Sequence, residues 1–304
     1  MRYHRRLLEN VTKHYDLYLF LLPALILIVT FRYVPIYGIQ LAFKDFAPAV
    51  GITESPWVGL KHFSRFFRSY QSFSLIANTF VLNFYQLLAG FPMPIILALL
   101  LSHMGNIRYR KIVQTSTYLP HFISVVVVVG MMNIIFSPRV GMYAHIMRLL
   151  DRPVQNLMGN ARLFKSMYVV SGIWQHCGWD SIIYIAALSG INPSLYEAAE
   201  VDGASVLRKI FHIDIPGILP TIMIIFILRT GRMMDVGFEK VYLMQNDLNI
   251  TTSEVISTYV YKVGLLASQF SFSTAIGLFS NIINFILLIS VNFLSRRAGQ
   301  YSLW

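Results

Sequence analysis

The sequence has little charge, one cysteine, and none of the common motifs that hold nucleotides or metals. Charged side chains make up 13% of the 304 residues, whereas soluble domains approach a quarter. The single cysteine, Cys177, excludes an internal disulfide and a zinc cluster of thiolates, and we expect it to be a buried free thiol. No G-x-x-x-x-G-K-[ST] phosphate loop and no H-E-x-x-H zinc spacing occurs. The chain therefore does not cradle ATP by that device, and we expect no metal site and no catalytic residues.

Long uncharged runs are present instead, and they predict a protein that crosses a membrane several times. Hydrophobic side chains make up 56% of the sequence. A hydrocarbon core about 30 Å thick requires about 20 residues of helix. We therefore expect an all-α membrane domain over residues 17–295, between a cytoplasmic N-terminal segment (1–16) and a cytoplasmic tail (296–304). Its six predicted spans lie near 17–37, 75–102, 112–137, 166–190, 216–235 and 273–295.

The distribution of positive charge predicts the orientation of these spans. Lysine and arginine number 25 against 14 aspartates and glutamates, a net charge of +11 that phospholipid headgroups explain without nucleic acid. Basic residues close to span ends mark the cytoplasmic side. They occur at Arg5–Arg6, Arg108–Lys111 and Arg296–Arg297, which places both termini in the cytoplasm. No small-residue cleavage site follows the first basic cluster, so we expect the first span to be retained.

The loop between the fourth and fifth predicted spans, residues 191–215, carries the most specific pattern. Asn192 and Pro193 are a suitable cap and first turn for a helix of about ten residues, and Gly203 offers the positive φ that ends a helix. Pro216 is then expected to begin the fifth span. Between them we expect a second amphipathic stretch. Its apolar side is Leu207, Ile210, Phe211 and Ile213.

The same loop resembles the cytoplasmic E-A-A loop of permease subunits in binding-protein-dependent ABC importers. The matching residues are Glu197, Ala198, Ala199, Asp202, Gly203, Ala204, Phe211 and Pro216. The resemblance implies the six-helix type I permease fold, in which this loop forms a coupling helix that docks in a groove of an ATPase subunit. Short alanine side chains would permit close contact there, and Glu197 and Asp202 would cap helix ends or pair with basic residues of the ATPase.

Other segments resemble the carbohydrate branch of these permeases, and within it the sub-group for oligosaccharides from alginate or pectic rhamnogalacturonan. These segments are Tyr18–Ala24, Tyr33–Gly38, Ala42–Phe46, Ser55–Leu60, Tyr118–Ser124 and Tyr301–Trp304. The resemblance implies a non-enzymatic subunit in a bacterial plasma or inner membrane that imports oligosaccharides. Its implied partners are a homologous second permease, two subunits that bind ATP and magnesium, and an extracellular or periplasmic sugar-binding protein. Closure of the ATPases would then drive alternating access.

A sugar path needs hydrogen-bonding groups and aromatic faces inside the predicted spans. Ionisable residues there are the strongest candidates, because each costs about 2.5 to 3.5 kcal/mol to insert. The candidates in the fourth span are Trp174, Gln175, His176, Trp179 and Asp180, and those in the fifth are Arg229, Arg232 and Asp235. His176 and Asp180 are spaced to meet across one helical turn. The residues of the fifth span follow at three-residue steps along one face. Arg229 or Arg232 would pair with the carboxylates of a uronate-containing cargo.

A structural interpretation of these residues stays open. Arg232 and Asp235 form an ion pair near the outer interface in this alternative, Trp179 anchors the span in the headgroup region, and His176 is a packing residue. At the level of function, a secondary transporter would need a coupling-ion site and usually an internal repeat. A membrane-embedded enzyme would need a nucleophile with a base, or a set of metal ligands. The sequence shows no convincing repeat or catalytic set, so it favours the ATP-driven permease.

Overall fold

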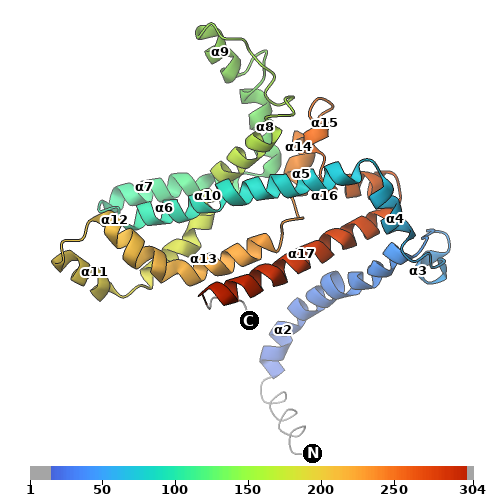
Figure 1. The fold of residues 1–304 in the computed structure, drawn as a ribbon, viewed down its shortest axis with the longest axis horizontal. Coiled ribbons are helices and arrows are strands. Elements are labelled where there is room, and N and C mark those ends of the chain that lie inside the picture. Colours follow the sequence, from blue (N-terminus) through green and yellow to red (C-terminus); the bar gives the residue numbers. More distant parts are fainter. Residues whose placement is uncertain (1–14, 300–304) are drawn as a thin grey trace, which may run out of the picture.

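Long helices dominate residues 15–299, the part of the chain that the computed structural model describes (Figure 1). Within these residues the extended structure is a single bridge between Lys44 and Trp57, so the all-α prediction is confirmed. Most of the predicted N-terminal segment (1–16), the end of the predicted tail and the Tyr301–Trp304 motif lie outside the described residues.

The helices that correspond to the six predicted spans contain several π and 3-10 turns. In chain order they are α2 (Tyr15–Ile28) with η1 (Val29–Tyr33) and η2 (Val34–Phe43); α5 (Ser72–Tyr85) with η3 (Gln86–Gly90) and α6 (Pro92–Ser102); α7 (Ile107–Tyr118) with η4 (Leu119–Phe122) and α8 (Val125–Ile135); α10 (Phe164–Ser189); α12 (Val206–Lys209) with η5 (Ile210–Asp214) and α13 (Ile215–Thr230); and α17 (Phe270–Gly299). Shorter helices connect them. These are α3 (Gly51–Glu54), α4 (Lys61–Arg68), α9 (Met142–Leu149), α11 (Pro193–Val201), α14 (Phe238–Met244), α15 (Ile250–Ser253), α16 (Ile256–Tyr261) and η6 (Lys262–Leu266).

By length and composition, four runs of the described residues are suited to cross a membrane. They are Tyr15–Phe43, Ser72–Ser102, Val206–Thr230 and Phe270–Arg297. A fifth is the pair Ile107–Phe122 and Val125–Ile135, whose two halves are bent by 99°. The remaining predicted span corresponds to α10, which at 26 residues is about 39 Å long but carries more polar side chains. The six-span prediction therefore depends on the bent pair and on α10.

The fifth predicted span begins and ends earlier than its sequence indicates. Its helix starts at Val206 and runs through the π turn η5 into α13, so Pro216 lies in the first turn of α13 and does not begin the helix. The prediction was wrong there because α12 and η5 already form the beginning of the helical run, so Pro216 lies inside it. Gly231 caps the helix after Thr230.

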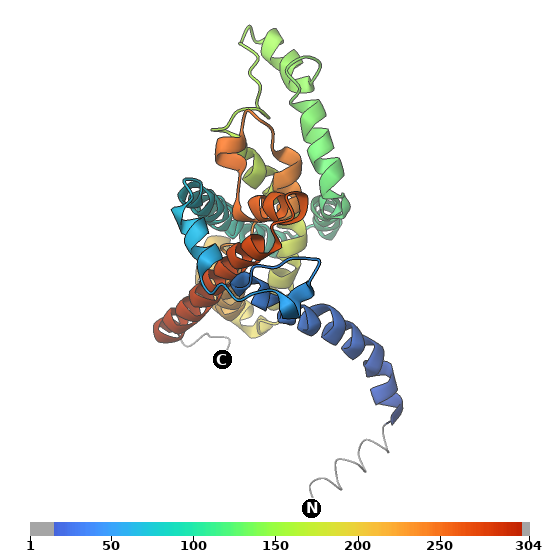
Figure 2. The same cartoon turned by 90° about the vertical axis from the view of Figure 1, so that its right-hand side faces the viewer.

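The helix α10 lies at the centre of the bundle and contacts α6, α7 and α13 (Figures 1 and 2). Gly178 permits its approach to α7, because a Cβ atom at Gly178 would lie 2.1 Å from the carbonyl oxygen of Thr117. Small residues allow such close backbone contacts between membrane helices. Polar side chains join other helices: Asn83 donates to the carbonyl of Met233 at 2.7 Å, and Asn284 accepts from the amide of Met234 at 2.8 Å.

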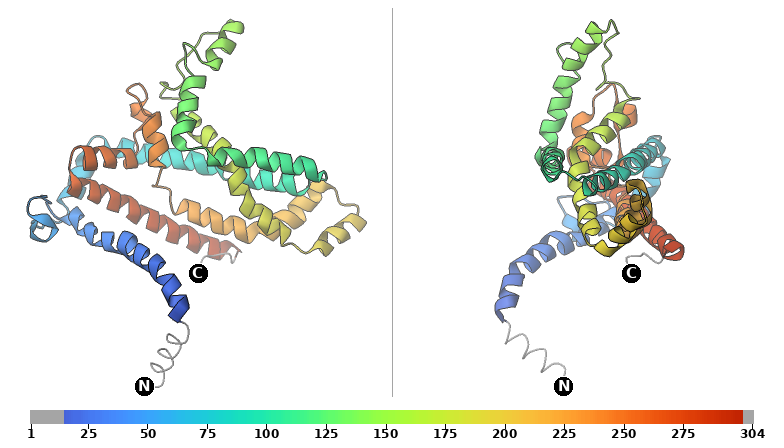
Figure 3. Two further views of the ribbon diagram at one scale, coloured as in Figure 1. Left: turned by 180° about the vertical axis from the view of Figure 1, so that it is seen from behind. Right: turned by 90° about the vertical axis from the view of Figure 1, so that its left-hand side faces the viewer.

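The first helical run, Tyr15–Phe43, packs against α17 through η2, and its N-terminal part extends away from the bundle (Figure 3). None of the residues in its most apolar window is buried by the rest of the chain. Phe20 is 86% exposed and Phe31 is 71% exposed. In a membrane this surface is covered by lipid or by another subunit.

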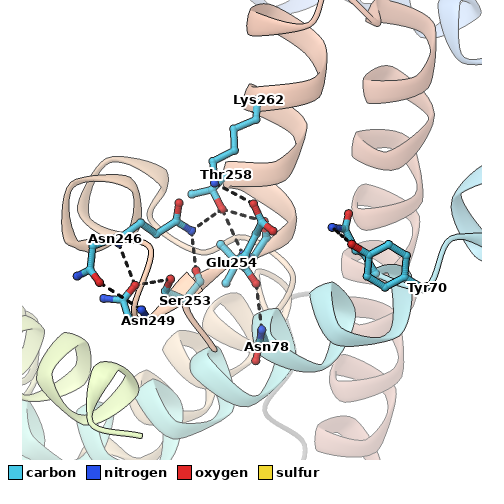
Figure 4. A network of polar contacts seen from close by, with 11 residues as sticks. Tyr70, Asn78, Asn246, Asn249, Ser253, Glu254, Thr258 and Lys262 are labelled. Atoms are coloured by element: carbon cyan, nitrogen blue, oxygen red, sulfur yellow. Dashed lines mark hydrogen bonds and ion pairs between the residues drawn. The ribbon is translucent and has the colours of Figure 1, made fainter. Parts of the chain in front are cut away.

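A polar network fastens the segment between α14 and α16 to the bundle (Figure 4). The side-chain amides of Asn246 and Asn249 both donate to the carbonyl of Met158 at 3.0 Å, just before α10. Asn78 of α5 donates to the carbonyl of Glu254 at 3.2 Å, and the carboxylate of Glu254 pairs with Lys262 at 2.8 Å. These bonds secure the connection between the fifth and sixth predicted spans to α5 and to the start of α10.

Candidate functional sites

The helix α11 is built as its sequence predicts. The side chain of Asn192 accepts a hydrogen bond from the amide of Ser194 at 3.1 Å, and Pro193 is the first helical residue. At the other end Gly203 has a φ of +66°, and the amide of Ala204 donates to the carbonyl of Ala199 at 2.8 Å. A Cβ atom at Gly203 would meet nothing within 4 Å. Gly203 is therefore required by its backbone conformation and not by crowding.

The predicted coupling residues lie on the surface at one end of the molecule, where α11 stands out from the bundle (Figure 1). Glu197, Ala198, Asp202, Gly203, Phe211 and Pro216 are exposed, whereas Ala199 and Ala204 are partly buried. Within residues 15–299 the carboxylates of Glu197 and Asp202 make no hydrogen bond or ion pair. The sequence interpretation missed Val201, an apolar residue of α11 that is 89% exposed. This end of the molecule thus offers free carboxylates and apolar side chains to another protein.

Two side-chain links join α11 to the membrane helices. Lys209 of α12 pairs with Glu200 at 2.8 Å, and this hydrogen bond with its charge lowers the pKa of Glu200. The pair is therefore present at neutral pH and is lost only as the pH falls into the acid range. The second link runs from the hydroxyl of Tyr196 to the carboxylate of Asp214 at 2.5 Å. Burial raises the pKa of Tyr196, and the bond to Asp214 raises it further, so Tyr196 remains a donor.

A cavity of about 590 Å³ lies between α10 and α13 and contains three of the residues proposed for the sugar path, Asp180, Arg229 and Arg232. Its other lining residues are Trp179, Ile182, Ile183, Tyr184, Ala186, Ile225 and Leu228. A guanidinium nitrogen of Arg229 lies 2.5 Å from the carboxylate of Asp180, and each side chain is 31% exposed. The cavity lining thus combines the Asp180–Arg229 ion pair, the guanidinium of Arg232 and the indole ring of Trp179 with apolar side chains.

The arginines differ in how they are engaged. Arg229 is neutralised by Asp180, whereas the exposed Arg232 makes no side-chain hydrogen bond or ion pair within the described part of the chain. The predicted pair of Arg232 with Asp235 is absent, and only a backbone bond joins the two residues, at 2.9 Å. Because α13 ends at Thr230, Arg232 and Asp235 lie in the turns that follow it and share no helix face with Arg229. The prediction of one continuous face was wrong for that reason.

The remaining candidates lie away from the cavity lining. Gln175 is 1% exposed, and its amide donates to the carbonyl of Ile123 at 2.9 Å, where the bend between α7 and α8 begins. It therefore packs between helices. Trp174 is 48% exposed but is not part of the cavity wall, and neither is Asp235.

His176 pairs with a residue that the sequence interpretation missed. Its Nδ1 atom lies 3.2 Å from Nδ1 of His121, and the expected contact with Asp180 is replaced by the Asp180–Arg229 pair. His121 also stacks on Trp179, with ring centroids 4.4 Å apart and an interplanar angle of 1°. The sequence feature that could have identified His121 is Pro120, which directly precedes it and interrupts the third predicted span. Trp179 thus stacks on His121 and also lines the cavity between α10 and α13.

Within residues 15–299 no group of three or more His, Cys, Asp or Glu side chains is arranged to hold a metal ion. Cys177 is partly exposed and not fully buried as expected.

Comparisons with known proteins agree over nearly the whole chain. The family described as "Binding-protein-dependent transport system inner membrane component" matches residues 71–300. A polygalacturonan/rhamnogalacturonan transport system permease protein, YteP of Bacillus subtilis (strain 168), is 40% identical over 99% of this chain and 94% of its own length. Protein LplB of the same organism is 38% identical over 95% of this chain and 91% of its own.

Two solved structures also match nearly the whole chain, at a similar sequence identity. A chain in the crystal structure of a bacterial ABC transporter involved in the import of the acidic polysaccharide alginate has a TM-score of 0.89. It is 38% identical, and the match covers 97% of this chain and 99% of that one. A second structure holds the bacterial alginate ABC transporter in complex with an alginate pentasaccharide-bound periplasmic protein, with a TM-score of 0.89 and 37% identity over 98% of this chain and 100% of that one.

Proposed function

This chain belongs to the inner membrane components of binding-protein-dependent transport systems, and from that premise we propose that it forms half of the translocation path of an ATP-driven oligosaccharide importer. It is a permease subunit of the ABC importer class with a multi-pass membrane fold. The observation that carries the proposal is α11, whose free carboxylates and Gly203 turn stand outside the bundle with the spacing of a coupling helix.

The proposed assembly contains a second, homologous permease, two ATPase subunits and a sugar-binding protein. The ATPase subunits bind ATP and magnesium, and both termini of this chain lie on the cytoplasmic side. Glu197 and Asp202 pair with basic side chains of the ATPase, while Val201 fills an apolar contact. The similarity to an alginate transporter crystallised with its periplasmic protein supports the outer partner.

The transport cycle follows from these contacts. Closure of the two ATPase subunits on ATP displaces α11, and the membrane helices change from an inward-open to an outward-open arrangement. Each ligand shifts this equilibrium only by its difference in affinity for the two states. The cavity between α10 and α13 is exposed to one side and then to the other.

Vesicles that contain this chain, the second permease and the ATPase pair test the function. With oligogalacturonides and the binding protein outside, we expect uptake only when ATP is present with the ATPase. Uptake driven by an ion gradient without ATP would indicate a secondary transporter instead, and cleavage of the oligogalacturonide by this chain would indicate an enzyme.

We further propose that the cargo is acidic and that Arg232 contacts its carboxylates. Two observations support this step: Arg232 lines the cavity as a cation without a carboxylate partner among the described residues, and Trp179, one face of which stacks on His121, is 42% exposed and lines the same cavity. Charge-assisted hydrogen bonds are worth about 1.5 to 3 kcal/mol when shielded from water, and less at an exposed site such as this one.

Replacing Arg232 by alanine is therefore expected to lower uptake of an oligogalacturonide up to about tenfold, which corresponds to about 1.4 kcal/mol. Uptake of a neutral oligosaccharide of the same length should change less than twofold. Arg139→Ala is the matched control, because Arg139 is an exposed arginine outside the cavity lining. Equal losses for both cargoes would show that Arg232 acts on the fold or on the cycle and not on the charge of the cargo.

A further inference from the structure

A fully buried carboxylate lies where α11 meets two of the membrane helices. Asp214 is the last residue of η5, and its side chain is 1% exposed. One of its oxygens accepts the hydroxyl of Tyr196 from α11 at 2.5 Å, and the other lies 2.5 Å from Nε2 of His103, directly after α6. One carboxylate therefore joins three elements that are separate in the sequence.

The surroundings of Asp214 make these two partners indispensable to it. The adjoining residues Ile210, Ile215 and Ile218 belong to an apolar cluster between α6, α10 and α13. A carboxylate withdrawn from water loses several kcal/mol of solvation, which is offset only when both oxygens are hydrogen bonded or paired. Asp214 thus depends on Tyr196 and His103 for the hydrogen bonds that offset its burial.

The backbone at this point is not a uniform α-helix. The π turn η5 separates α12 from α13, with the amide of Ile215 bonded to the carbonyl of Ile210. Turns of this kind are rare and occur frequently at functional sites, and helices commonly bend at them. A displacement of α11 and α12 can therefore be absorbed at η5 unless side chains oppose it, and Asp214 lies directly at that position.

The other link between α11 and the membrane helices is weaker. Glu200, which pairs with Lys209, has a side chain that is 70% exposed. Exposed ion pairs contribute little to stability and are screened by salt. The buried junction at Asp214 is the stronger connection.

We propose that Asp214 is a positioning residue that transmits the movement of α11 to the second and fifth membrane helices through Tyr196 and His103. The proposal rests on the role of α11 as the coupling helix. When the ATPase pair displaces α11, the hydroxyl of Tyr196 carries Asp214 with it, and His103 moves the end of α6 along the same path. Without this junction, η5 yields, and ATP is hydrolysed without a matching movement of the bundle.

The test compares Tyr196→Phe with Tyr109→Phe in the complete transporter in vesicles. Tyr109 is an exposed tyrosine of α7 whose hydroxyl makes no hydrogen bond within the described residues. We expect Tyr196→Phe to keep ATP hydrolysis within twofold of the original and to lower the number of oligogalacturonides imported per ATP at least threefold. Tyr109→Phe should leave that ratio unchanged. Asp214→Asn, which keeps the size of the side chain and removes its charge, should lower the ratio as well.

Two outcomes would overturn the proposal. An unchanged ratio in Tyr196→Phe would show that the junction does not transmit movement. A proportional fall of hydrolysis and uptake, together with a lower melting temperature of the purified complex, would show that it serves folding alone.

A cross-linking measurement separates this failure from failure of the proposed function. In a Cys177→Ser background, Val201→Cys introduces one exposed thiol on α11, and a short thiol-to-amine reagent should join it to the ATPase subunit. If the cross-link forms but Tyr196→Phe leaves the number of oligogalacturonides imported per ATP unchanged, only the proposed role of Asp214 is disproved. Loss of the cross-link in an assembled, active transporter would remove the coupling role of α11 itself.

Discussion

Replacing Gly203 by valine is expected to lower ATP-driven uptake at least tenfold while the chain still folds and assembles. Gly203 has a φ of +66°, and a side chain there would meet no neighbouring atom. The whole effect therefore comes from the backbone, where a residue other than glycine in the left-handed region costs about 1 to 3 kcal/mol, most for a β-branched one. Relief of this strain changes the angle between α11 and α12 and moves Glu197 and Val201 away from the ATPase.

Two matched variants make the result specific. Gly203→Asn should retain most of the uptake, since asparagine tolerates positive φ better than other residues. Gly51 has a φ of +78° and equally open surroundings, but it lies in α3 at the other end of the molecule (Figure 1). Gly51→Val introduces the same kind of strain away from the coupling helix and should leave uptake within twofold. A similar loss in Gly51→Val and Gly203→Val would contradict a special role of the α11 turn.

Replacing Asp180 by alanine should lower uptake more than tenfold and also lower the yield of folded protein. The change leaves Arg229 without the carboxylate that lies 2.5 Å away, inside a cavity with mainly apolar walls. Removal of one partner of a buried pair destabilises by about 3 to 5 kcal/mol, and the partial exposure of both side chains places this pair below that range. Melting of the detergent-solubilised complex and uptake into vesicles measure the two effects separately.

The double variant Asp180→Ala with Arg229→Met distinguishes a structural pair from a pair that serves transport. Replacing both charges by apolar groups is often neutral for stability, so we expect the melting temperature to recover. Uptake should remain low if the pair lines the sugar path, because the cavity then loses the charges of Asp180 and Arg229 and retains only that of Arg232. Full recovery of uptake would show that Asp180 and Arg229 stabilise the fold and have no role in transport.

The parts of the fold that depend on local sequence could be predicted. Runs without charge gave the positions of the long helices, because composition and length decide whether a helix can reside in a bilayer. The cap at Asn192 and the turn at Gly203 were also predictable, since each depends on the conformational preference of one residue.

The helix boundaries around Pro216 and the pairing of charged residues could not be predicted. The π turn η5 carries the helix past the expected boundary, and nothing in the local sequence identifies it. Spacing along a helix suggested His176 with Asp180, but residues from other helices, His121 and Arg229, are their partners. Sequence distance describes neighbours within one helix, whereas tertiary packing decides which charges meet across helices.

The exposed first helix affects the stability of this protein before it assembles with other subunits. A newly made copy leaves the surface of α2 and η1, Tyr15–Tyr33, exposed, while η2 packs against α17. When a subunit is stabilised by binding to others, its apparent stability rises with their concentration. An excess of this chain over its companions is therefore expected to be less stable than the assembled subunit.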